Sequence, residues 1–445
     1  MPDWTLRLVD VLGAPLDDIA EPHLQALVDN GVREDADLDF KRDQYGMSDS
    51  AKREMAGDIA AMANDRGGLL IIGVADENDV AVKRTPVDIE GGDEARIRQT
   101  AASLIVPHVH FEIRVVSSND TAGRGYYLLL IPPSPLRPHA VRKDQDLRYP
   151  RRDGTTTRWL SEAEVADMYR DRFRSTGDQI GRLEAILDEG RDQILVREDA
   201  WVAVAVVPDI PGSTSISLER VNEIAAWAAQ FGSGDYWRGF YPTKPMATAG
   251  VRRFRVAPPT SRGEAPWWVY SELYVDGAGF AAYRLQDPRQ NADGTDTWIV
   301  NEHLVMALAR AMKLLGRHAV ENTGAAGDVV LEAKLVGSLP LRLAYLHHIG
   351  PASIPEEVDG GRAIGHANSR HTLPLGALVG GAQELLAASR LVATDLFNAF
   401  GSPEVRHIAA DGSLRPGYFG LGWQQVARIA GEDGVSITEE AVPGE

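Results

Sequence analysis

Residues 61–76 read "AMANDRGGLLIIGVAD" and join the end of a helix to a turn and a strand. Upstream, Met55, Ile59 and Met62 lie at helical spacing, which predicts a helix over residues 50–63. The two glycines at 67 and 68 can take positive φ or allow close backbone approach, and they belong to no GxxxxGK[ST] or GxGxxG phosphate loop. The apolar run that follows is typical of a buried strand. This stretch therefore predicts a helix packed against an internal strand.

The flanking sequence extends the same mixed pattern. Residues 36–42, "ADLDFKR", alternate apolar and charged side chains, which predicts a strand with one buried face carrying Leu38 and Phe40. Residues 17–30 predict a helix that ends before Gly31. Short strands are predicted over 109–116, 125–132 and 146–151, and "SEAE" at 161–164 resembles a capping box that starts a helix.

The second half of the chain predicts another mixed region. An apolar strand covers 201–207, a hairpin turns at 276–279, and helices cover 299–317 and 376–400. The fold class is therefore α+β throughout. We divide the chain into a helical lead-in at 1–30, a mixed-sheet domain at 31–175, a connecting helix at 176–197 and a second α+β domain at 198–445.

Composition excludes several kinds of chemistry. The 445 residues include no cysteine, which rules out disulfides, thiolate catalysis and iron–sulfur clusters. No apolar run is long enough to span a membrane and no signal peptide is recognisable, so we expect a cytoplasmic protein without a membrane partner. The net charge is −18, with −8 before residue 176 and −10 after it. Binding to nucleic acid would therefore need a local basic patch or screening metal ions.

Five carboxylates lie close together between Glu34 and Asp43, and Asp76 ends the apolar strand. Glu34, Asp39 and Asp76 are candidate ligands for Mn²⁺ or Mg²⁺, which prefer oxygen donors. Lys41 lies on the same strand face as Asp39 and could pair with it or stabilise charge on a phosphate. On the sequence pattern alone, a solvated acidic surface is the better interpretation of these carboxylates. Glu34 and Asp39 can converge only if the chain bends near residues 35–36.

Residues 137–158 form the one locally basic stretch, with a net charge of +4 and aromatic residues Tyr149 and Trp159 beside it. Arginines with aromatic side chains suit single-stranded or looped RNA, in which bases stack and phosphates need neutralising. A solvated hairpin explains the stretch equally well. The candidate nucleic-acid-binding residues are Arg142, Lys143, Arg148, Arg151, Arg152 and Arg158.

The ordered set of motifs over residues 30–173 resembles the Schlafen-type AlbA-like (AlbA_2) domain. It comprises Glu34, "DFK" at 39–41, "AMANDRGG" at 61–68, "LLIIGVAD" at 69–76 and "RYPRRDGTTTRWLSEAEV" at 148–165. The resemblance implies a mixed sheet with packed helices. In nuclease-active members it implies a metal-dependent ribonuclease site acting on tRNA, whose three acids correspond to Glu34, Asp39 and Asp76. Two departures stand out: Asp39 replaces the common Glu, and Asp35 replaces the usual Ser.

With this resemblance, the leading hypothesis is a Mn²⁺- or Mg²⁺-dependent endoribonuclease that cleaves tRNA or another structured RNA. Glu34, Asp39 and Asp76 would hold the ion, Lys41 would neutralise charge, and the basic residues would grip the RNA backbone. Residues 198–445 would sense an unknown trigger or build a homodimer or higher homo-oligomer. The resemblance also implies a bacterial stress or phage-defence effector. The alternatives are a non-catalytic, DNA-binding transcriptional regulator and a protein-interaction scaffold, which the negative charge favours.

Overall fold

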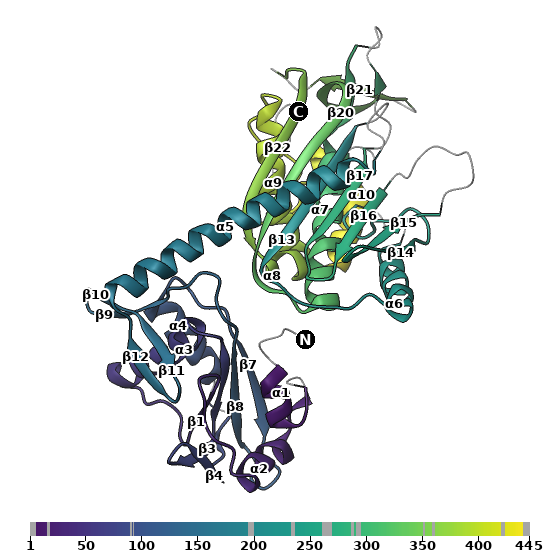
Figure 1. The fold of residues 1–445 in the computed structure, drawn as a ribbon. Helices are drawn as coiled ribbons and strands as arrows, with labels where there is room; N and C mark the ends of the chain where they lie inside the picture. The colour runs from purple at the N-terminus through teal and green to yellow at the C-terminus, as the bar shows by residue number, and fades with distance from the viewer. Residues whose placement is uncertain are drawn as a thin grey trace. The chain divides into compact units, whose positions relative to one another are not determined.

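The computed structural model divides into two compact units, Met1–Asp178 and Gln179–Glu445 (Figure 1). It describes residues 6–15, 18–89, 91, 93–194, 200–232, 236–259, 269–285, 289–290, 295–349, 352–357, 361–419 and 423–438. Helices and strands are mixed in both units, which confirms the predicted α+β class. No helix in these segments is long and apolar enough to cross a bilayer.

In its described residues, the first unit contains twelve strands, four complete helices and the start of a fifth helix. The helices are α1 (Leu6–Leu12), α2 (Glu21–Asp29), α3 (Asp49–Ala63), α4 (Asp93–Leu104) and α5 (Glu162–Arg191), which runs on into the second unit. The strands are β1 (Leu38–Lys41), β2 (Gly68–Ile72), β3 (Val74–Glu77), β4 (Val80–Arg84), β5 (Val87–Asp88), β6 (Ile105–Val106), β7 (Glu112–Ser117), β8 (Arg124–Ile131), β9 (Ala140–Lys143), β10 (Asp146–Arg148), β11 (Pro150–Asp153) and β12 (Thr156–Trp159).

The central sheet of this unit has the order β1-β2-β8-β5, with β7 also paired to β8. Strands β1 and β2 are parallel, and β8 is antiparallel to β2, β5 and β7. Leu69 and Ile71 pack in one core with residues of α1 and α2, while Leu70 and Ile72 pack with residues of α3 on the other face. Both faces of β2 are therefore covered, which confirms the buried strand predicted from its apolar run.

Strand β1 differs from its prediction because both of its faces are buried. Leu38 and Phe40 enter the core as expected, but Asp39 on the opposite face is only 2% exposed. The alternating pattern had predicted that Asp39 would face solvent. The prediction was wrong because buried Arg152 and partly buried Lys41 pair with this carboxylate, and alternation alone cannot reveal such partners.

The apolar stretch that begins in β2 does not continue as one strand to Asp76. It breaks at Gly73, where φ is +107° and an added Cβ would lie 2.8 Å from the ring of Tyr126. After this break, β3 leaves the central sheet and pairs only with β4 in a two-stranded hairpin. The glycine therefore redirects the chain and places Asp76 on a separate hairpin.

Asn64 fastens the C-terminal end of α3 to distant parts of the unit. Its side-chain amide donates to the carbonyl oxygens of His139 and Pro150 at 2.8 and 2.7 Å, and its Oδ1 accepts from the amide of His139 at 2.6 Å. The residue is fully buried. These three bonds hold β9 and β11 next to α3, so Asn64 positions the strands that carry the basic stretch.

The second unit is built on a ten-stranded sheet. Its main path is β14-β15-β16-β17-β13-β20-β19-β18, and β21 and β22 also pair with β20. The strands are β13 (Trp201–Ile210), β14 (Met246–Gly250), β15 (Arg253–Ala257), β16 (Val269–Tyr274), β17 (Gly279–Arg284), β18 (Arg289–Gln290), β19 (Thr297–Val300), β20 (Ala326–Ile349), β21 (Ala352–Glu357) and β22 (Ile364–Pro374). The helices are α6 (Leu218–Ala228), α7 (Asn301–Arg317), α8 (Leu375–Val379), α9 (Ala382–Ala399) and α10 (Trp423–Glu432).

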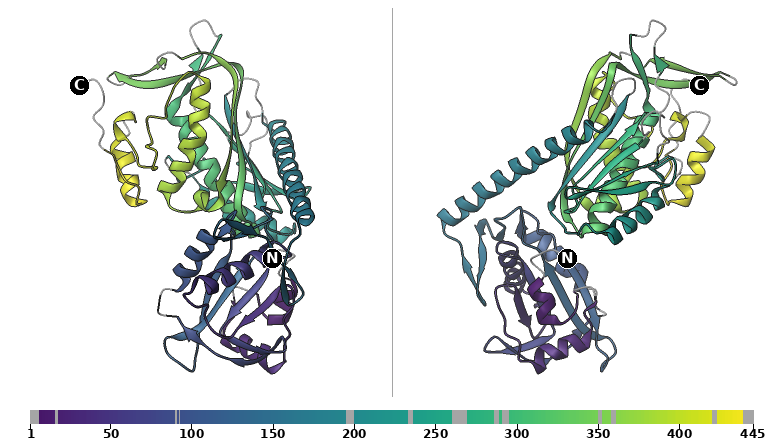
Figure 2. Two further views of the ribbon diagram at one scale, coloured as in Figure 1. Left: turned by 90° about the vertical axis from the view of Figure 1, so that its left-hand side faces the viewer. Right: turned by 45° about the vertical axis from the view of Figure 1, so that its right-hand side comes forward.

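Helices cover both faces of this sheet (Figure 2). The larger core joins the sheet to helices α6 to α10. The smaller core lies on the other face, where Leu183, Ile186 and Leu187 of α5 pack against Trp201 and Phe280. The C-terminal half of α5 is therefore an integral part of the second unit.

Most of the elements predicted for the second half of the chain are present. Strand β13, the β16–β17 hairpin and helix α7 confirm the predictions at 201–207, 276–279 and 299–317. The single helix predicted over 376–400 is wrong, because the chain breaks it at residues 380–381 into α8 and α9. Two adjacent glycines lower helix propensity enough to permit this break.

Replacing Asn64 with Ala should destabilise the first unit by about 2–4 kcal/mol, because three buried backbone groups lose their partner. Differential scanning calorimetry of the full chain measures this as a lower transition temperature for the first unit. Asn119→Ala is the matched control, since Asn119 is exposed. Equal transition temperatures for both variants would contradict the role given to Asn64.

Candidate metal centre and nucleic-acid interface

A tight turn brings Glu34 back toward β1. Asp35 and Leu38 exchange backbone hydrogen bonds of 3.1 and 3.2 Å, so the chain reverses direction through residues 36 and 37. This is the bend that convergence of Glu34 and Asp39 requires. After the turn, Glu34 Oε1 accepts a hydrogen bond of 2.6 Å from the Phe40 amide. The carboxylate is thereby fixed beside the strand that carries Asp39.

The β3–β4 hairpin brings two more acids to Glu34. Its tip consists of Asn78 and Asp79, both with positive φ, which Asn and Asp tolerate better than most residues. The Glu34 amide donates to the Asp79 carbonyl at 2.7 Å, and the Ala81 amide donates to the Val32 carbonyl at 2.9 Å. The segment before β1 therefore runs alongside the hairpin. This places Asp76, on β3, and Asp79, at the turn, next to Glu34.

Glu34, Asp76 and Asp79 form one carboxylate cluster. One oxygen of each lies within 4.8 Å of the others. Among the residues that the structure describes, no Lys or Arg makes an ion pair with any of the three. Thr155, at the turn between β11 and β12, donates to Asp79 Oδ2 at 3.3 Å. The cluster thus concentrates negative charge without a counter-cation from the described part of the chain.

The excess of negative charge in the cluster changes the pKa of Glu34. Burial, together with the nearby carboxylates of Asp39 and Asp76, raises the pKa of Glu34 to about 7. The Phe40 amide and Lys41 lower the pKa but do not outweigh these effects. A divalent cation at the cluster would supply the missing positive charge.

A second group of carboxylates, by contrast, is neutralised from within. Asp39 Oδ2 accepts from Lys41 Nζ at 2.5 Å, and Asp39 Oδ1 accepts from Arg152 Nη1 at 3.0 Å. Lys41 Nζ also lies 3.6 Å from Asp58, whose carboxylate accepts a 2.7 Å hydrogen bond from the Tyr45 hydroxyl. The two cations and two carboxylates balance, so this group differs in kind from the cluster around Glu34.

The pKa values in this second group follow from burial and neighbouring charge. Burial lowers the pKa of Lys41, but the carboxylates of Asp58, Asp39 and Glu34 outweigh it, so the net shift is upward. Burial also raises the pKa of Asp58, against the effect of Lys41. Lys41 therefore stays protonated, and 26% of its side chain is exposed to solvent.

The rest of the acidic stretch is only partly solvated. The guanidinium of Arg7, on α1, pairs with Asp37 and lies 3.4 Å from Asp35. Asp37 is 5% exposed, whereas Asp43 is exposed. Most of these acids therefore have specific partners. Glu34 differs because its carboxylate accepts from a backbone amide and makes no ion pair with a Lys or Arg that the structure describes.

The basic stretch is also neutralised over much of its length. Arg152 is 5% exposed and binds Asp39, Arg151 donates to Asp65 at 2.9 Å, and Arg158 donates to Glu164 at 2.6 Å. Arg142, Lys143 and Arg148 are exposed on the β9–β10 hairpin. The net charge counted from the sequence therefore overstates the positive charge offered to a ligand.

Arg148 lies over the exposed ring of Trp159, with 5.8 Å between its guanidinium carbon and the ring centroid. This cation–π pair joins β10 to β12 and leaves a flat, partly aromatic surface in solvent. Leu147 beside it is 49% exposed. In the register of the hairpin, Lys143 lies on the same face as Arg148, and Arg142 lies on the opposite face with Leu147. The Arg148–Trp159 pair suits a base, and the exposed cations of the hairpin suit phosphates.

Sequence reasoning missed Asp79, Asp58 and Arg7. An available signal for Asp79 was the "ND" pair at 78–79 between two strand-like runs, which favours a two-residue hairpin turn. No local signal marks Asp58, which lies in the middle of a helix. Arg7 is 30 residues from Asp37, so only the folded chain reveals their pairing.

Residues 34–161 match the model of the family described as "Schlafen, AlbA_2", and this part of the chain is therefore a Schlafen AlbA_2 domain. The match begins at Glu34 and ends as α5 begins. It includes every residue of both carboxylate groups, the β9–β12 strands and Trp159. The family is associated with nucleic acids, which gives the domain a nucleic-acid-related function at that level of detail.

Two solved structures are similar to part of the chain. The DIP2311 protein from Corynebacterium diphtheriae has 19% identity and a TM-score of 0.23, with 33% of this chain and 27% of that one covered. The N-terminal domain of a putative ATP-dependent DNA helicase RecG-related protein from Nitrosomonas europaea has 19% identity and a TM-score of 0.22, with 31% and 93% covered. Likeness at this level supports no functional argument. No curated protein matches the chain.

The affinity of the full chain for Mn²⁺ should rise about tenfold from about pH 6 to about pH 8. Glu34 must lose its proton to bind a cation, and its pKa of about 7 makes that loss occur within this range. Isothermal titration calorimetry at the two pH values measures the change.

Glu77→Gln is the matched control, because Glu77 is an exposed acid on β3 outside the cluster. It should bind Mn²⁺ as the wild type does, and Glu34→Gln should bind at least tenfold more weakly at the higher pH. An affinity independent of pH would contradict the assignment of Glu34 as a ligand.

Proposed function

We propose that the Schlafen AlbA_2 domain is a divalent-metal-dependent endoribonuclease that acts on structured RNA, with tRNA as the preferred substrate. The observation that carries the proposal is the cluster of Glu34, Asp76 and Asp79, whose three carboxylates converge without a cation among the described residues. Hard oxygen donors in this number suit Mn²⁺ or Mg²⁺, which complete their coordination with water and phosphate oxygens.

In this proposal Glu34, Asp76 and Asp79 hold the ion. When bound, the ion supplies polarisation of the phosphodiester and activation of water. Asp39 does not bind the ion in this proposal. Its bonds to Lys41 and Arg152 hold β1 beside the cluster. Lys41, partly exposed and kept protonated by Asp58 and Asp39, stabilises negative charge that develops on the phosphate.

The RNA is bound by the exposed β9–β10 hairpin, which carries Arg142, Lys143 and Arg148, and by Trp159 of β12. Arg142 and Lys143 contact phosphates, while the paired Arg148 and Trp159 stack against an unpaired base. Arg152 is buried, so its role is to position Asp39. Arg151 and Arg158 are held by acids of the same unit and support the β11–β12 hairpin.

A second candidate function is binding to nucleic acid without cleavage. The observation that favours it is the neutralised state of Asp39, one of the three acids that the family resemblance implies for catalysis. In this case the exposed cations and Trp159 would suffice for binding. Replacement of Asp76 would then leave binding unchanged and no cleavage would occur.

Cleavage of purified total tRNA tests the proposal. The full chain should give discrete fragments with Mn²⁺ or Mg²⁺ and none with EDTA. Glu34→Ala and Asp76→Ala should each reduce the rate at least about 100-fold, because each removes a ligand of the ion. Glu77→Ala, which removes an exposed acid of β3, should cleave at the wild-type rate.

Fragments that persist in EDTA or in both ligand variants would overturn metal-dependent cleavage by this site. Bound but intact tRNA, with equal affinity for the wild type and Asp76→Ala, would establish the non-catalytic function instead. Neither cleavage nor binding at physiological salt would favour the scaffold hypothesis.

The salt dependence of RNA binding should be shallow. Arg142 and Lys143 are the two cations that contact phosphates, and they predict a slope of about −1.4 in a plot of log affinity against log salt concentration for single-stranded RNA. Arg142→Ala should reduce the magnitude of the slope by about 0.7. Arg158→Ala should leave it unchanged, because Arg158 is already paired with Glu164. A slope of about −4, expected if all six candidate basic residues contacted phosphates, would contradict the roles given to the basic stretch.

A further inference from the structure

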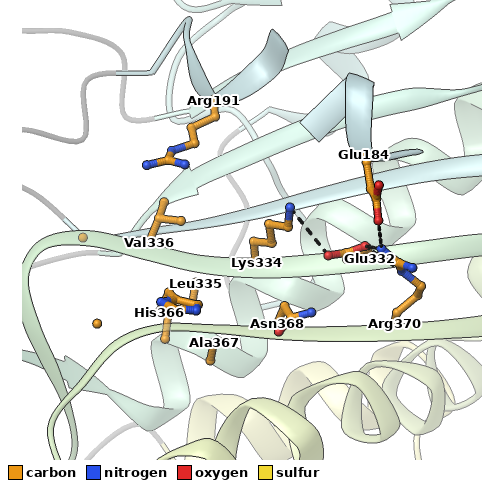
Figure 3. Close-up of a pocket in the computed structure, with 12 residues that line it drawn as sticks. Glu184, Arg191, Glu332, Lys334, Leu335, Val336, His366, Ala367, Asn368 and Arg370 are labelled. Carbon is orange, nitrogen blue, oxygen red and sulfur yellow. Dashed lines mark hydrogen bonds and ion pairs between the residues drawn. The ribbon is translucent and has the colours of Figure 1, made fainter. Parts of the chain in front are cut away.

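A cavity of about 550 Å³ lies in the second unit, between the C-terminal end of α5 and the neighbouring strands β20 and β22 (Figure 3). Its lining includes Glu184 and Arg191 from α5, Glu332 and Lys334 from β20, and His366 and Asn368 from β22. A volume of this size accommodates a small organic ligand. The cavity belongs to the ten-stranded sheet and involves no residue of the Schlafen AlbA_2 domain.

The cavity exists because α5 covers only part of its sheet face. Under the helix, this face is apolar, with Trp201, Ala203 and Ala205 of β13 in the core. Lys334 of β20 lies opposite Ala203 in the antiparallel register, so its side chain emerges on the same face. Asn368 of β22 lies opposite Lys334. The face thus changes from apolar to polar where the helix no longer covers it.

The acids of the cavity are largely occupied by one arginine. Glu332 is 1% exposed and accepts from Arg370 Nε at 2.7 Å. The same guanidinium lies 2.8 Å from Glu184. Arg370 therefore bridges both carboxylates, which compensates a buried charge that would otherwise be costly.

Two cations of the lining, Lys334 and Arg191, have N–H donors that the described acids leave available. Among the described acids, Lys334 contacts one, Glu332, at 3.7 Å, and its ammonium has three donors. Arg191 makes no ion pair with any residue that the structure describes. Figure 3 shows Arg191 above the strands that carry Lys334 and His366. The charged side chains of the lining sum to a net charge of +1 inside a strongly acidic chain, so the cavity favours an anion.

From this arrangement we infer that the cavity binds a small organic phosphate of mononucleotide size. Arg191 and Lys334 bind the phosphate, for which the guanidinium offers paired donors and the ammonium a point charge. The amide of Asn368 and the imidazole of His366 offer donors and acceptors to the organic part, and Val336 provides an aliphatic surface. The second unit is then a ligand-binding module joined to the nuclease domain by α5.

Isothermal titration calorimetry of the full chain with AMP, UMP, ATP, inorganic phosphate and adenosine tests the inference. At least one nucleotide should bind with a micromolar dissociation constant, at least tenfold tighter than inorganic phosphate or adenosine. Arg191→Gln and Lys334→Gln should each weaken that binding at least tenfold, and Lys334→Arg should restore it to within about threefold, because it keeps the charge. Lys244→Ala, an exposed lysine of the same unit, is the control and should bind normally.

Glu34→Ala separates this inference from the proposed nuclease, since it should bind the nucleotide as the wild type does whether or not it cleaves RNA. Equal unfolding temperatures for the Lys334 variants would exclude loss of folding as the cause of weaker binding. The inference is overturned if no nucleotide binds below millimolar concentration. It is also overturned if the Arg191 and Lys334 variants bind as tightly as the wild type, or if Glu34→Ala abolishes binding.

Discussion

The ion pair between Asp39 and Arg152 joins the first strand of the central sheet to the hairpin that closes the Schlafen AlbA_2 domain. Both side chains are only 3% exposed, and 113 residues separate them in the sequence. A buried pair of this kind contributes little net stability, but losing one partner leaves an uncompensated charge in the interior. The pair therefore fixes where β11 lies relative to β1, and Thr155 at the hairpin turn is held beside Asp79 as a result.

This constraint also divides the acids of the domain into two groups with different chemistry. Asp39 and Asp58 share Lys41, and Arg152 completes their neutralisation. Glu34, Asp76 and Asp79 receive no such cation within the described chain, and the raised pKa of Glu34 follows from burial beside other carboxylates. Carboxylates that a fold brings together without neutralising them are natural ligands for a divalent ion, and that contrast supports a metal centre at Glu34 over one at Asp39.

Much of the fold could be predicted from local pattern. The apolar run after Gly68, the helix before it and the hairpin at 276–279 were predictable because burial and turn chemistry act over a few residues. The failures have a common physical origin. The burial of Asp39, the ion pairs of Arg151 and Arg152, and the meeting of Asp79 with Glu34 all depend on partners far away in the sequence. Charge counts cannot identify such partners, nor do they show the pair of Arg158 with Glu164, which spans only six residues. The break at residues 380–381 was visible as two glycines, but the alanine- and leucine-rich pattern around it masked the signal.

The second unit also contains a site at which charged side chains are only partly neutralised by their neighbours. Arg370 satisfies Glu332 and Glu184, which leaves Lys334 and Arg191 as the cations of a cavity at the edge of α5. In both units, the residues that neutralise one another shape the structure, and the charges left over mark the places where a ligand of opposite sign would bind. Helix α5 contributes to the core of the second unit and also begins directly after the β12 strand of the first.

Anomalous X-ray diffraction from crystals soaked in Mn²⁺ would show whether Glu34, Asp76 and Asp79 form the metal centre. We expect an anomalous peak about 2.2 Å from a carboxylate oxygen of each of these three residues, the distance expected for Mn²⁺ bound to oxygen. A peak between Asp39 and Asp58, with Lys41 displaced, would contradict it, and so would the absence of any peak at the cluster when Mn²⁺ is bound elsewhere on the protein.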